Sequence, residues 1–275
     1  MKVIRDQTLE LLQRHGLTVD AILDEQQLID PLVIAALIEA SGLKPTETVL
    51  EIGPGAGNIT VELARRVKKV YAVEKNPKFL SPLKERFDGS SVEVIIGDAL
   101  TLYLPEFDVL VSNMPYAIVE AMLQRLKRLH FRVASLLVPI SFATTITSKK
   151  GTQFYTKLSL EANLFYEVSM VTVVKQASYH PEPKTETALI ILKPKGPENN
   201  TRGVIWQLLQ QGDKKTSNAL REALISIKSY PQTKRTAKET IAKLKLDEPL
   251  LEKRVAALSL IDVELIQSRL DENTS

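Results

Sequence analysis

The sequence predicts an α/β fold in which a Rossmann-like parallel sheet is followed by a small all-α C-terminal domain. Apolar segments of strand length alternate with amphipathic ones from residue 48 to about residue 139, as expected for parallel strands joined by helices. A glycine-rich turn separates the first of these strands from its helix. Beyond a linker at residues 194–200, only helical periodicity is left. We therefore expect two domains, at residues 1–194 and 195–275.

The composition narrows the class of protein. The chain has 275 residues, of which 44% are hydrophobic, enough for a sizeable core. No apolar run is long enough to span a bilayer and no signal-peptide pattern is present, so we expect a cytoplasmic protein without membrane contact. The absence of cysteine excludes disulfides and a thiol nucleophile, and three scattered histidines predict no metal site. A net charge of +3 permits nucleic-acid binding without requiring it.

Two helices are expected before the glycine-rich turn. Residues 2–15 carry a weak helical stripe, which the polar Thr8 interrupts. Asp30 and Pro31 mark the start of a second helix, because an N-cap residue is followed by proline at the first helical position. Gly42 ends that helix.

The segment at residues 48–60 reads TVLEIGPGAGNIT, which predicts a buried strand, a tight turn and a helix that begins near Asn58. Glycine lets the backbone approach a bound nucleotide or adenosyl group closely. A dinucleotide site would have a third glycine where this chain has Asn58. Glu51, just before the turn, suits the ammonium group of S-adenosylmethionine better than an anionic pyrophosphate. The predicted cofactor contacts are Glu51, Gly53, Gly55 and Gly57; the alternative is a turn without a ligand.

Acidic residues also stand at the ends of the next two strands. Glu74 ends the strand predicted at residues 67–73, where it is placed to accept hydrogen bonds from two ribose hydroxyls. Asp98 follows the strand at residues 92–96 and is placed to accept a hydrogen bond from an adenine amine. Both lie at the carboxyl ends of strands, where open α/β sheets bind ligands. Their neighbours Lys75 and Ala99 are assigned to the same site.

The fourth strand, at residues 107–111, leads to the motif Asn113-Met114-Pro115-Tyr116. The amine of adenine is a poor nucleophile because its lone pair is delocalised into the ring. The side-chain oxygen of Asn113 and the carbonyl of Met114 can accept its hydrogens and free the lone pair to attack a sulfonium methyl. Pro115 fixes the direction of that carbonyl, and Tyr116 offers an aromatic face to a flipped base. All four are predicted catalytic residues, and Asn113 also a cofactor contact; the alternative is a turn with a packed tyrosine.

Further strands are expected at residues 132–139, 166–174 and 188–192. The last two lie on either side of a proline-rich loop. In the second domain, helices are expected at residues 204–211, 217–226, 237–246 and 255–270.

These motifs resemble those of the ribosomal RNA adenine dimethyltransferases of the KsgA type, over about residues 23–224. The similar segments are EIGPGAG at residues 51–57, Glu74, GDAL at residues 97–100, and NMPY at residues 113–116. The resemblance implies an S-adenosylmethionine-dependent methyltransferase that dimethylates two adjacent adenines near the 3′ end of small-subunit rRNA. The partner that the resemblance implies is this rRNA or the pre-ribosomal small subunit. We take a monomer as the default oligomeric state.

The resemblance extends to a second aromatic residue and to a segment that departs from the family. Residues 179–184, YHPEPK, are similar to the family's F-x-P-x-P-K loop, whose aromatic closes over the target base, so the resemblance assigns Tyr179 to catalysis. The family's G-Q-N-F-L or G-Q-H-F-L corresponds to DEQQL at residues 24–28. That segment lies beside the cofactor and RNA in the family, which assigns Gln26 and Leu28 to the cofactor site.

The second domain is basic. Between Arg202 and Lys245 there are ten Lys or Arg residues against three Asp or Glu, a composition suited to phosphate contacts and also found on solvated helix faces. The predicted RNA contacts are Lys214, Lys215, Arg221, Lys234 and Arg235. A second basic cluster, which would continue this track on the first domain, consists of Arg125, Lys127, Arg128 and Arg132.

Two other functions fit parts of the sequence. A non-catalytic RNA-binding assembly or transcription factor on the same fold would explain the departures at residues 24–27, whereas the intact NMPY motif favours catalysis. Methylation of a glutamine amide in a protein is a third possibility, because N-P-P-Y motifs also serve amides. The basic second domain and the proline-rich aromatic loop argue against it.

Overall fold

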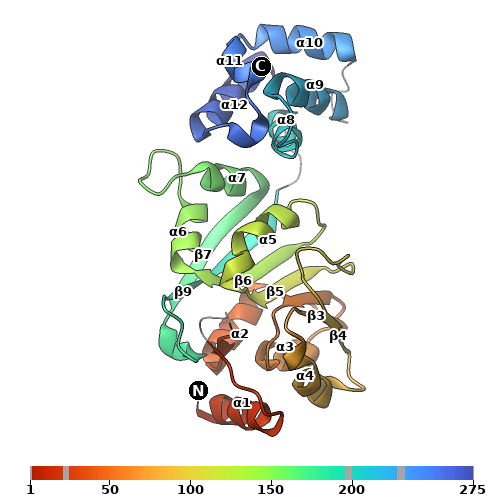
Figure 1. The fold of residues 1–275 in the computed structure, drawn as a ribbon, viewed down its shortest axis with the longest axis vertical. Helices are drawn as coiled ribbons and strands as arrows, with labels where there is room; N and C mark the ends of the chain where they lie inside the picture. The colour runs from red at the N-terminus through yellow and green to blue at the C-terminus, as the bar shows by residue number, and fades with distance from the viewer. Residues whose placement is uncertain (1, 21–24, 196–199, 228–232, 275) are drawn as a thin grey trace. The chain divides into compact units, whose positions relative to one another are not determined.

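The computed structural model describes residues 2–20, 25–195, 200–227 and 233–274. The chain divides into two compact units, which Figure 1 shows. The sheet unit comprises Met1–Ser148 and Tyr166–Pro194, and the helical unit comprises Lys149–Phe165 and Lys195–Ser275. The division after Pro194 coincides with the predicted domain boundary, while residues 149–165 belong to the helical unit although the sequence had placed them in the first domain. Most of the predicted linker, residues 196–199, lies outside the described residues.

The sheet unit is built on seven strands in the order β4-β3-β2-β5-β6-β9-β7. The first five are mutually parallel, and β9 is antiparallel to its neighbours β6 and β7. Their bounds are Thr48–Ile52 (β2), Lys69–Glu74 (β3), Val92–Ile96 (β4), Val109–Asn113 (β5), Val133–Pro139 (β6), Tyr166–Val174 (β7) and Thr187–Pro194 (β9). The chain moves outward from β2 to β4 and then returns to β5. The carboxyl ends of β2 and β5 therefore form the switch point at which such sheets bind ligands, and the predicted α/β class is confirmed.

Five helices of the sheet unit follow the predicted alternation. They are α2 (Pro31–Ala40), α3 (Asn58–Ala64), α4 (Leu80–Phe87), α5 (Val119–Leu126) and α6 (Ile140–Thr147). As predicted, Asp30 caps α2 by accepting a hydrogen bond from the backbone N–H of Leu32 at 3.0 Å. The apolar face of α2 packs against the sheet in one core cluster with α3, and the hydroxyl of Ser135 donates to the carbonyl of Leu37 at 2.6 Å. These contacts fix α2 across β6.

The N-terminal part of the sheet unit lies against the start of α3. Helix α1 (Lys2–Arg14) packs Leu11 and Leu12 into a cluster with α4. A two-stranded antiparallel sheet then joins β1 (Gln27–Leu28) to β8 (Tyr179–His180). The sequence pattern did not predict this pairing, because two-residue strands carry no periodicity.

The helical unit contains α7 (Lys157–Phe165), α8 (Asn200–Leu209), α9 (Thr216–Ser226), α10 (Lys234–Lys243), α11 (Glu248–Glu252) and α12 (Leu260–Thr274). Leu160 and Leu164 lie one turn apart on α7 and are buried in a core shared with α8, α9 and α12. This apolar face is why residues 149–165 belong to the helical unit. Within the described ranges, no helix has both the length and the apolar character needed to cross a membrane.

Candidate active site

A cavity of about 530 Å³ lies at the carboxyl ends of the central strands. Its wall is formed by the segment at residues 25–28, the turn after β2, the ends of β3 and β4, and the segment after β5. The residues predicted for the cofactor site or for catalysis that line it are Gln26, Leu28, Gly53, Gly55, Glu74, Lys75, Asp98, Ala99, Asn113, Met114, Pro115 and Tyr116. Glu51, Gly57 and Tyr179 are not among its lining residues. The switch point of the sheet thus brings together five separate segments of the chain.

The turn after β2, residues 53–57, is called the glycine turn here. Gly53 has a φ of 70°, and a Cβ atom there would lie 3.0 Å from Cγ of Pro115. Only glycine combines this left-handed backbone with so close an approach. The glycine turn and the Asn113–Tyr116 motif therefore touch directly. Gly57 has a different role, because a Cβ atom there would meet the ring of Phe87 on α4 at 2.7 Å.

The N–H groups of the glycine turn are already engaged. Gly53 donates to the carbonyl of Val73 at 2.9 Å and Gly57 to that of Pro54 at 2.8 Å. Gly55 donates to a carboxylate oxygen of Glu74 at 3.1 Å. Ala56 donates to Oε1 of Gln27 at 2.8 Å. A pyrophosphate site depends on free N–H groups at such a turn, so this turn is poorly suited to a dinucleotide.

Carboxylates dominate the charge on the cavity wall. Glu74 accepts hydrogen bonds from the N–H groups of Asn76 and Gly55, and burial raises its pKa while these bonds lower it. The N–H of Leu100 and the ammonium of Lys75, 2.9 Å away, lower the pKa of Asp98. Lys75 is therefore the ion-pair partner of a predicted cofactor residue.

A third carboxylate, Glu25, was not predicted. It is 7% exposed and pairs with Lys78 at 2.6 Å, and it accepts a hydrogen bond from the side chain of Asn76 at 3.0 Å. Its neighbour Gln27 also lines the cavity. The sequence feature that could have indicated Glu25 and Gln27 as site residues was the departure from the family pattern at residues 24–27. Asp24 lies outside the described residues.

Glu51 lies behind the cavity wall. Its side chain is 1% exposed, and one carboxylate oxygen accepts a hydrogen bond from the hydroxyl of Thr60 at 2.6 Å. The other oxygen is buried and has no hydrogen-bond partner in the described part of the chain. Burial raises the pKa of Glu51 to about 8. A direct contact between Glu51 and a cofactor stays a prediction, since the cavity wall does not include this residue.

Asn113 ends β5 and presents an unsatisfied acceptor. Its side-chain nitrogen donates to the backbone carbonyl of Gln26 at 3.4 Å. Its side-chain oxygen is buried and accepts no hydrogen bond within the residues that the structure describes. The next residue, Met114, is anchored by its N–H to the carbonyl of Leu137 on β6 at 3.0 Å. The motif is thus held by its neighbours while one buried oxygen is left for a ligand to satisfy.

Tyr179 is buried and is not on the cavity wall, and its catalytic role stays a prediction. It is 2% exposed, its backbone pairs with Leu28, and its hydroxyl is hydrogen-bonded to that of Thr187 at 2.6 Å. Burial raises its pKa. The β1–β8 pairing holds the ring in the core that α2 covers. In this conformation, Tyr179 is a core residue rather than a stacking face on the cavity wall.

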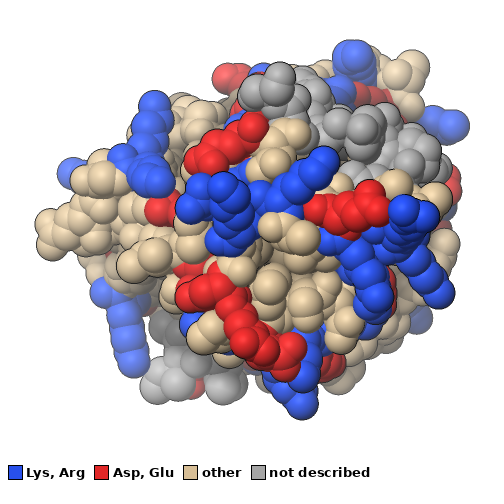
Figure 2. Space-filling model, turned by 90° about the horizontal axis from the view of Figure 1, so that it is seen from above, with Lys and Arg blue, Asp and Glu red and all other residues tan. Residues whose placement is uncertain are grey.

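The predicted RNA contacts on the helical unit differ in their ion pairs. Lys214 pairs with Glu222, Lys215 with Glu252, and Arg235 with Glu239. Neither Arg221 nor Lys234 has an ion pair with any residue in the described ranges. Figure 2 shows groups of lysine and arginine side chains with acidic side chains between them. The available positive charge is therefore smaller than the composition suggests.

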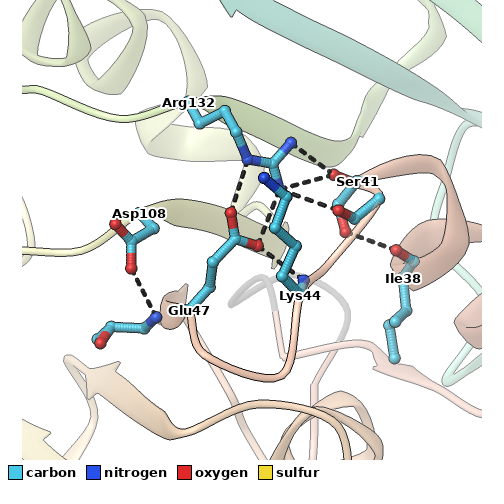
Figure 3. A network of polar contacts seen from close by, with 8 residues as sticks. Ile38, Ser41, Lys44, Glu47, Asp108 and Arg132 are labelled. Carbon is cyan, nitrogen blue, oxygen red and sulfur yellow. Dashed lines mark hydrogen bonds and ion pairs between the residues drawn. The ribbon is translucent and has the colours of Figure 1, made fainter.

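The second basic cluster is not a free surface track. The guanidinium of Arg132 contacts both carboxylate oxygens of Glu47, at 2.7 and 2.9 Å, and the carbonyls of Ser41 and Gly42 (Figure 3). Arg125 donates to the carbonyl of Leu102, and Lys127 donates to the side chain of Gln124 at 2.5 Å. Arg132 and Arg125 are thus engaged within the sheet unit, and their part in an RNA path stays a prediction.

No group of three or more metal-ligating His, Asp or Glu side chains occurs within residues 2–20, 25–195, 200–227 and 233–274.

Comparisons with known structures define the class first. A dimethyladenosine transferase from Plasmodium falciparum covers 89% of this chain, with 97% of its own length matched, at a TM-score of 0.61 and 24% identity. The 23S rRNA methyltransferase ErmE covers 89% of this chain, with 99% of its own length matched, at a TM-score of 0.60 and 24% identity. The fold is that of the Rossmann-like methyltransferases.

The sequence comparisons then identify the family. The profile described as ribosomal RNA adenine dimethylase matches residues 22–253, and the chain belongs to this family. The protein is 32% identical over 260 residues to a probable ribosomal RNA small subunit methyltransferase A of Thermococcus sibiricus, with 94% of both chains covered. It is also 32% identical over 274 residues to the protein of the same description from Methanothermobacter thermautotrophicus, with 99% of this chain and 98% of the relative covered.

Proposed function

We propose that this protein transfers methyl groups from S-adenosylmethionine to the exocyclic amines of two adjacent adenines near the 3′ end of small-subunit rRNA. One observation carries the proposal: Asn113 lies on the wall of a cavity rich in carboxylates, and its buried side-chain oxygen has no hydrogen-bond donor among the residues that the structure describes. Membership of the ribosomal RNA adenine dimethylase family supports the choice of adenine in rRNA.

The residues present fit a cationic, adenosine-containing cofactor. The glycine turn offers no free N–H for an anion, and Glu25, Glu74 and Asp98 line the cavity. Glu74 would hold the ribose hydroxyls and Asp98 the adenine amine, while Gly53 and Gly55 leave room for the backbone to approach. When bound, S-adenosylmethionine supplies a methyl group activated by its sulfonium charge.

The residues after β5 would prepare the substrate amine. The side-chain oxygen of Asn113 and the backbone carbonyl of Met114 accept the two amine hydrogens and localise the nitrogen lone pair. Tyr116 provides a face for the flipped base. For each methyl group that the amine gains, a nitrogen–carbon bond would form as the methyl–sulfur bond breaks, leaving S-adenosylhomocysteine, and the amine would give up one proton to bulk water. The chain's contribution is orientation and exclusion of water.

The helical unit, whose helices are drawn in Figure 1, carries the basic residues proposed to contact rRNA phosphates. We propose the rRNA within an immature small subunit as the substrate, a monomeric enzyme, and the cytoplasm as its compartment. Arg221 and Lys234 are the favoured contacts, because the other three predicted cations are already paired with carboxylates.

The test is methyl transfer from radiolabelled S-adenosylmethionine to immature small ribosomal subunits, with the labelled positions mapped by primer extension. We expect label at two adjacent adenines near the 3′ end, and transfer to both that is strongly slowed with Asn113→Ala. Cofactor binding without any label on rRNA would contradict the proposal and would favour a binding protein that kept its cavity.

A further inference from the structure

Two polar residues that interrupt their local patterns meet inside the sheet unit. Thr8 interrupts the apolar stripe of α1 and is 1% exposed. Asn58 replaces the third glycine of a dinucleotide-binding turn and is 8% exposed. The side-chain nitrogen of Asn58 lies 3.0 Å from the hydroxyl oxygen of Thr8. A buried contact between residues 50 positions apart in the sequence therefore explains both departures.

The hydrogen bonds around Asn58 form a complete set. The hydroxyl of Thr8 lies 2.7 Å from the carbonyl of Ile4 and 3.1 Å from the amide oxygen of Asn58. When its proton goes to the nearer Ile4 carbonyl, its oxygen accepts from the Asn58 amide nitrogen. The second N–H of the Asn58 amide donates to the carbonyl of Leu28 at 2.9 Å. The amide oxygen accepts from the guanidinium of Arg86 at 3.1 Å. Helix α1, strand β1 and helix α4 are thus joined at the first residue of α3.

The peptide groups of Ala56, inside the glycine turn, are held in the same way. Its N–H donates to the side-chain oxygen of Gln27 at 2.8 Å, and the side-chain nitrogen of Gln27 donates to the carbonyl of Glu25 at 2.7 Å. Its carbonyl accepts from the guanidinium of Arg86 at 2.5 Å. Leu11 and Leu12 of α1 pack with Ala56 and the apolar face of α4 behind these bonds. The turn is therefore held both by Gln27, which lines the cavity, and by Arg86 and α1, which do not.

We propose that helix α1 is a positioning element of the cofactor site, acting through Thr8 on Asn58. Asn58 lines the cavity, whereas Thr8 and Arg86 do not. The match to the family profile begins at residue 22, beyond the end of α1 at Arg14. Asn58, by contrast, lies inside the matched region. The inference rests on the proposed function in taking S-adenosylmethionine as the ligand of the cavity.

The expected effect is on cofactor binding rather than on the chemical step. Without the Thr8 hydroxyl, one N–H of Asn58 is buried without an acceptor unless the amide turns, which would disturb its bonds to Leu28 and Arg86. The turn then loses its defined position. We expect Thr8→Val to weaken binding of S-adenosylmethionine roughly fivefold to tenfold, with kcat at saturating cofactor and KM for rRNA unchanged.

The test is calorimetric titration of S-adenosylmethionine into the purified full chain, together with thermal unfolding. Thr8→Ser keeps the hydroxyl and should bind like the wild type. Thr144→Val is the matched control, because Thr144 also donates to the carbonyl four residues earlier, at 2.9 Å, but lies away from the glycine turn. Arg86→Met removes the hydrogen bonds that α4 makes to Ala56 and Asn58. It should weaken cofactor binding as Thr8→Val does.

The outcomes separate the two proposals. Weaker binding by Thr8→Val and Arg86→Met, with Thr8→Ser and Thr144→Val unaffected, is the expected result. If Thr8→Val lowers the unfolding temperature but binds the cofactor like the wild type, α1 merely packs against the turn and the inference fails. If the wild type itself does not bind S-adenosylmethionine, the proposed function fails and this inference with it.

Discussion

The polar side chains at the two ends of the central strands differ in whether they have hydrogen-bond partners within the chain. Strand β5 begins after Asp108 and ends at Asn113. At the amino end, Asp108 accepts a hydrogen bond from the N–H of Thr48 at 2.8 Å, and Arg132 forms two hydrogen bonds to Glu47 (Figure 3). At the carboxyl end, the side-chain oxygen of Asn113 is buried without a partner in the described chain.

This difference separates residues that stabilise the fold from residues that await a ligand. A buried polar atom without a hydrogen bond costs about 1–3 kcal/mol of stability. At the amino end of the strands, the polar side chains named above have hydrogen-bond partners within the chain, whereas the oxygen of Asn113 at the carboxyl end has none in the described residues. Under the proposed function, a donor on the substrate satisfies this oxygen. The amino end should respond to mutation in stability, and the carboxyl end in activity.

The largest expected effect is at Asn113. Asn113→Ala removes the acceptor proposed for the adenine amine, and kcat should fall roughly 10²-fold to 10³-fold, as for loss of one preorganised polar group. The Kd for S-adenosylmethionine should change little, because the glycine turn and the carboxylates are untouched. Steady-state kinetics with calorimetric titration checks both values. Wild-type turnover in the variant would refute the role.

Glu51 should make stability depend on pH at the carboxyl end. Burial raises its pKa from 4.5 to about 8, so the folded chain keeps a proton that the unfolded chain loses. Its stabilisation is fully present below the unfolded pKa and is lost as pH rises through about 8, by a few kcal/mol.

Glu51→Gln provides the comparison, because glutamine cannot ionise but can still accept a hydrogen bond from Thr60. Urea unfolding at about pH 5 and about pH 8 should show a loss in the wild type that the variant lacks. Parallel pH profiles would mean that the Glu51 carboxyl is not held protonated in the fold.

Arg132 should affect stability alone. Arg132→Met leaves Glu47, whose side chain is 10% exposed, without its partner, and we expect a loss of about 2 kcal/mol at neutral pH because the arginine is partly solvated. Arg132 lowers the pKa of Glu47 below 4.5, so this stabilisation is present above the unfolded pKa and is lost as pH falls. Denaturant unfolding should show wild type and variant converging in acid. A constant difference would argue against the ion pair.

The smallest effect is expected on the helical unit. Lys234→Gln removes a cation that has no ion pair among the described residues, and the slope of log affinity against log salt should decrease by about 1 for an rRNA fragment. Lys215→Gln removes a cation that is already paired with Glu252, and the slope should change less. Filter binding at several salt concentrations gives both slopes. The reverse order would show that surface ion pairs here do not limit RNA contact.

The strands and several cavity residues could be predicted because their signals are local. The predicted strands at residues 92–96 and 166–174 match the bounds of β4 and β7, since both segments are rich in β-branched residues. Glu74, Asp98 and Asn113 line the cavity as expected, because parallel strands present their carboxyl ends at one edge. Their chemical roles stay predictions.

The features that were missed depend on contacts between distant segments. Tyr179 is drawn into the core by pairing between strands of two residues each, about 150 positions apart, and no periodicity announces such a contact. The same holds for α7, whose place in the helical unit follows from the partners of Leu160 and Leu164. Thr8 and Asn58 were visible as departures from pattern, but only the structure shows that their side chains are hydrogen-bonded to each other.

The most direct test of the contrast between the strand ends is a crossed measurement. Unfolding free energy and single-turnover methyl transfer at saturating cofactor are measured on the same preparations of Asn113→Ala and Arg132→Met. We predict that Asn113→Ala lowers the rate of methyl transfer and leaves the unfolding free energy unchanged. Arg132→Met should lower the unfolding free energy and leave the rate unchanged. If Asn113→Ala instead unfolds more easily and still transfers methyl groups at the wild-type rate, Asn113 is a structural residue and the account is wrong.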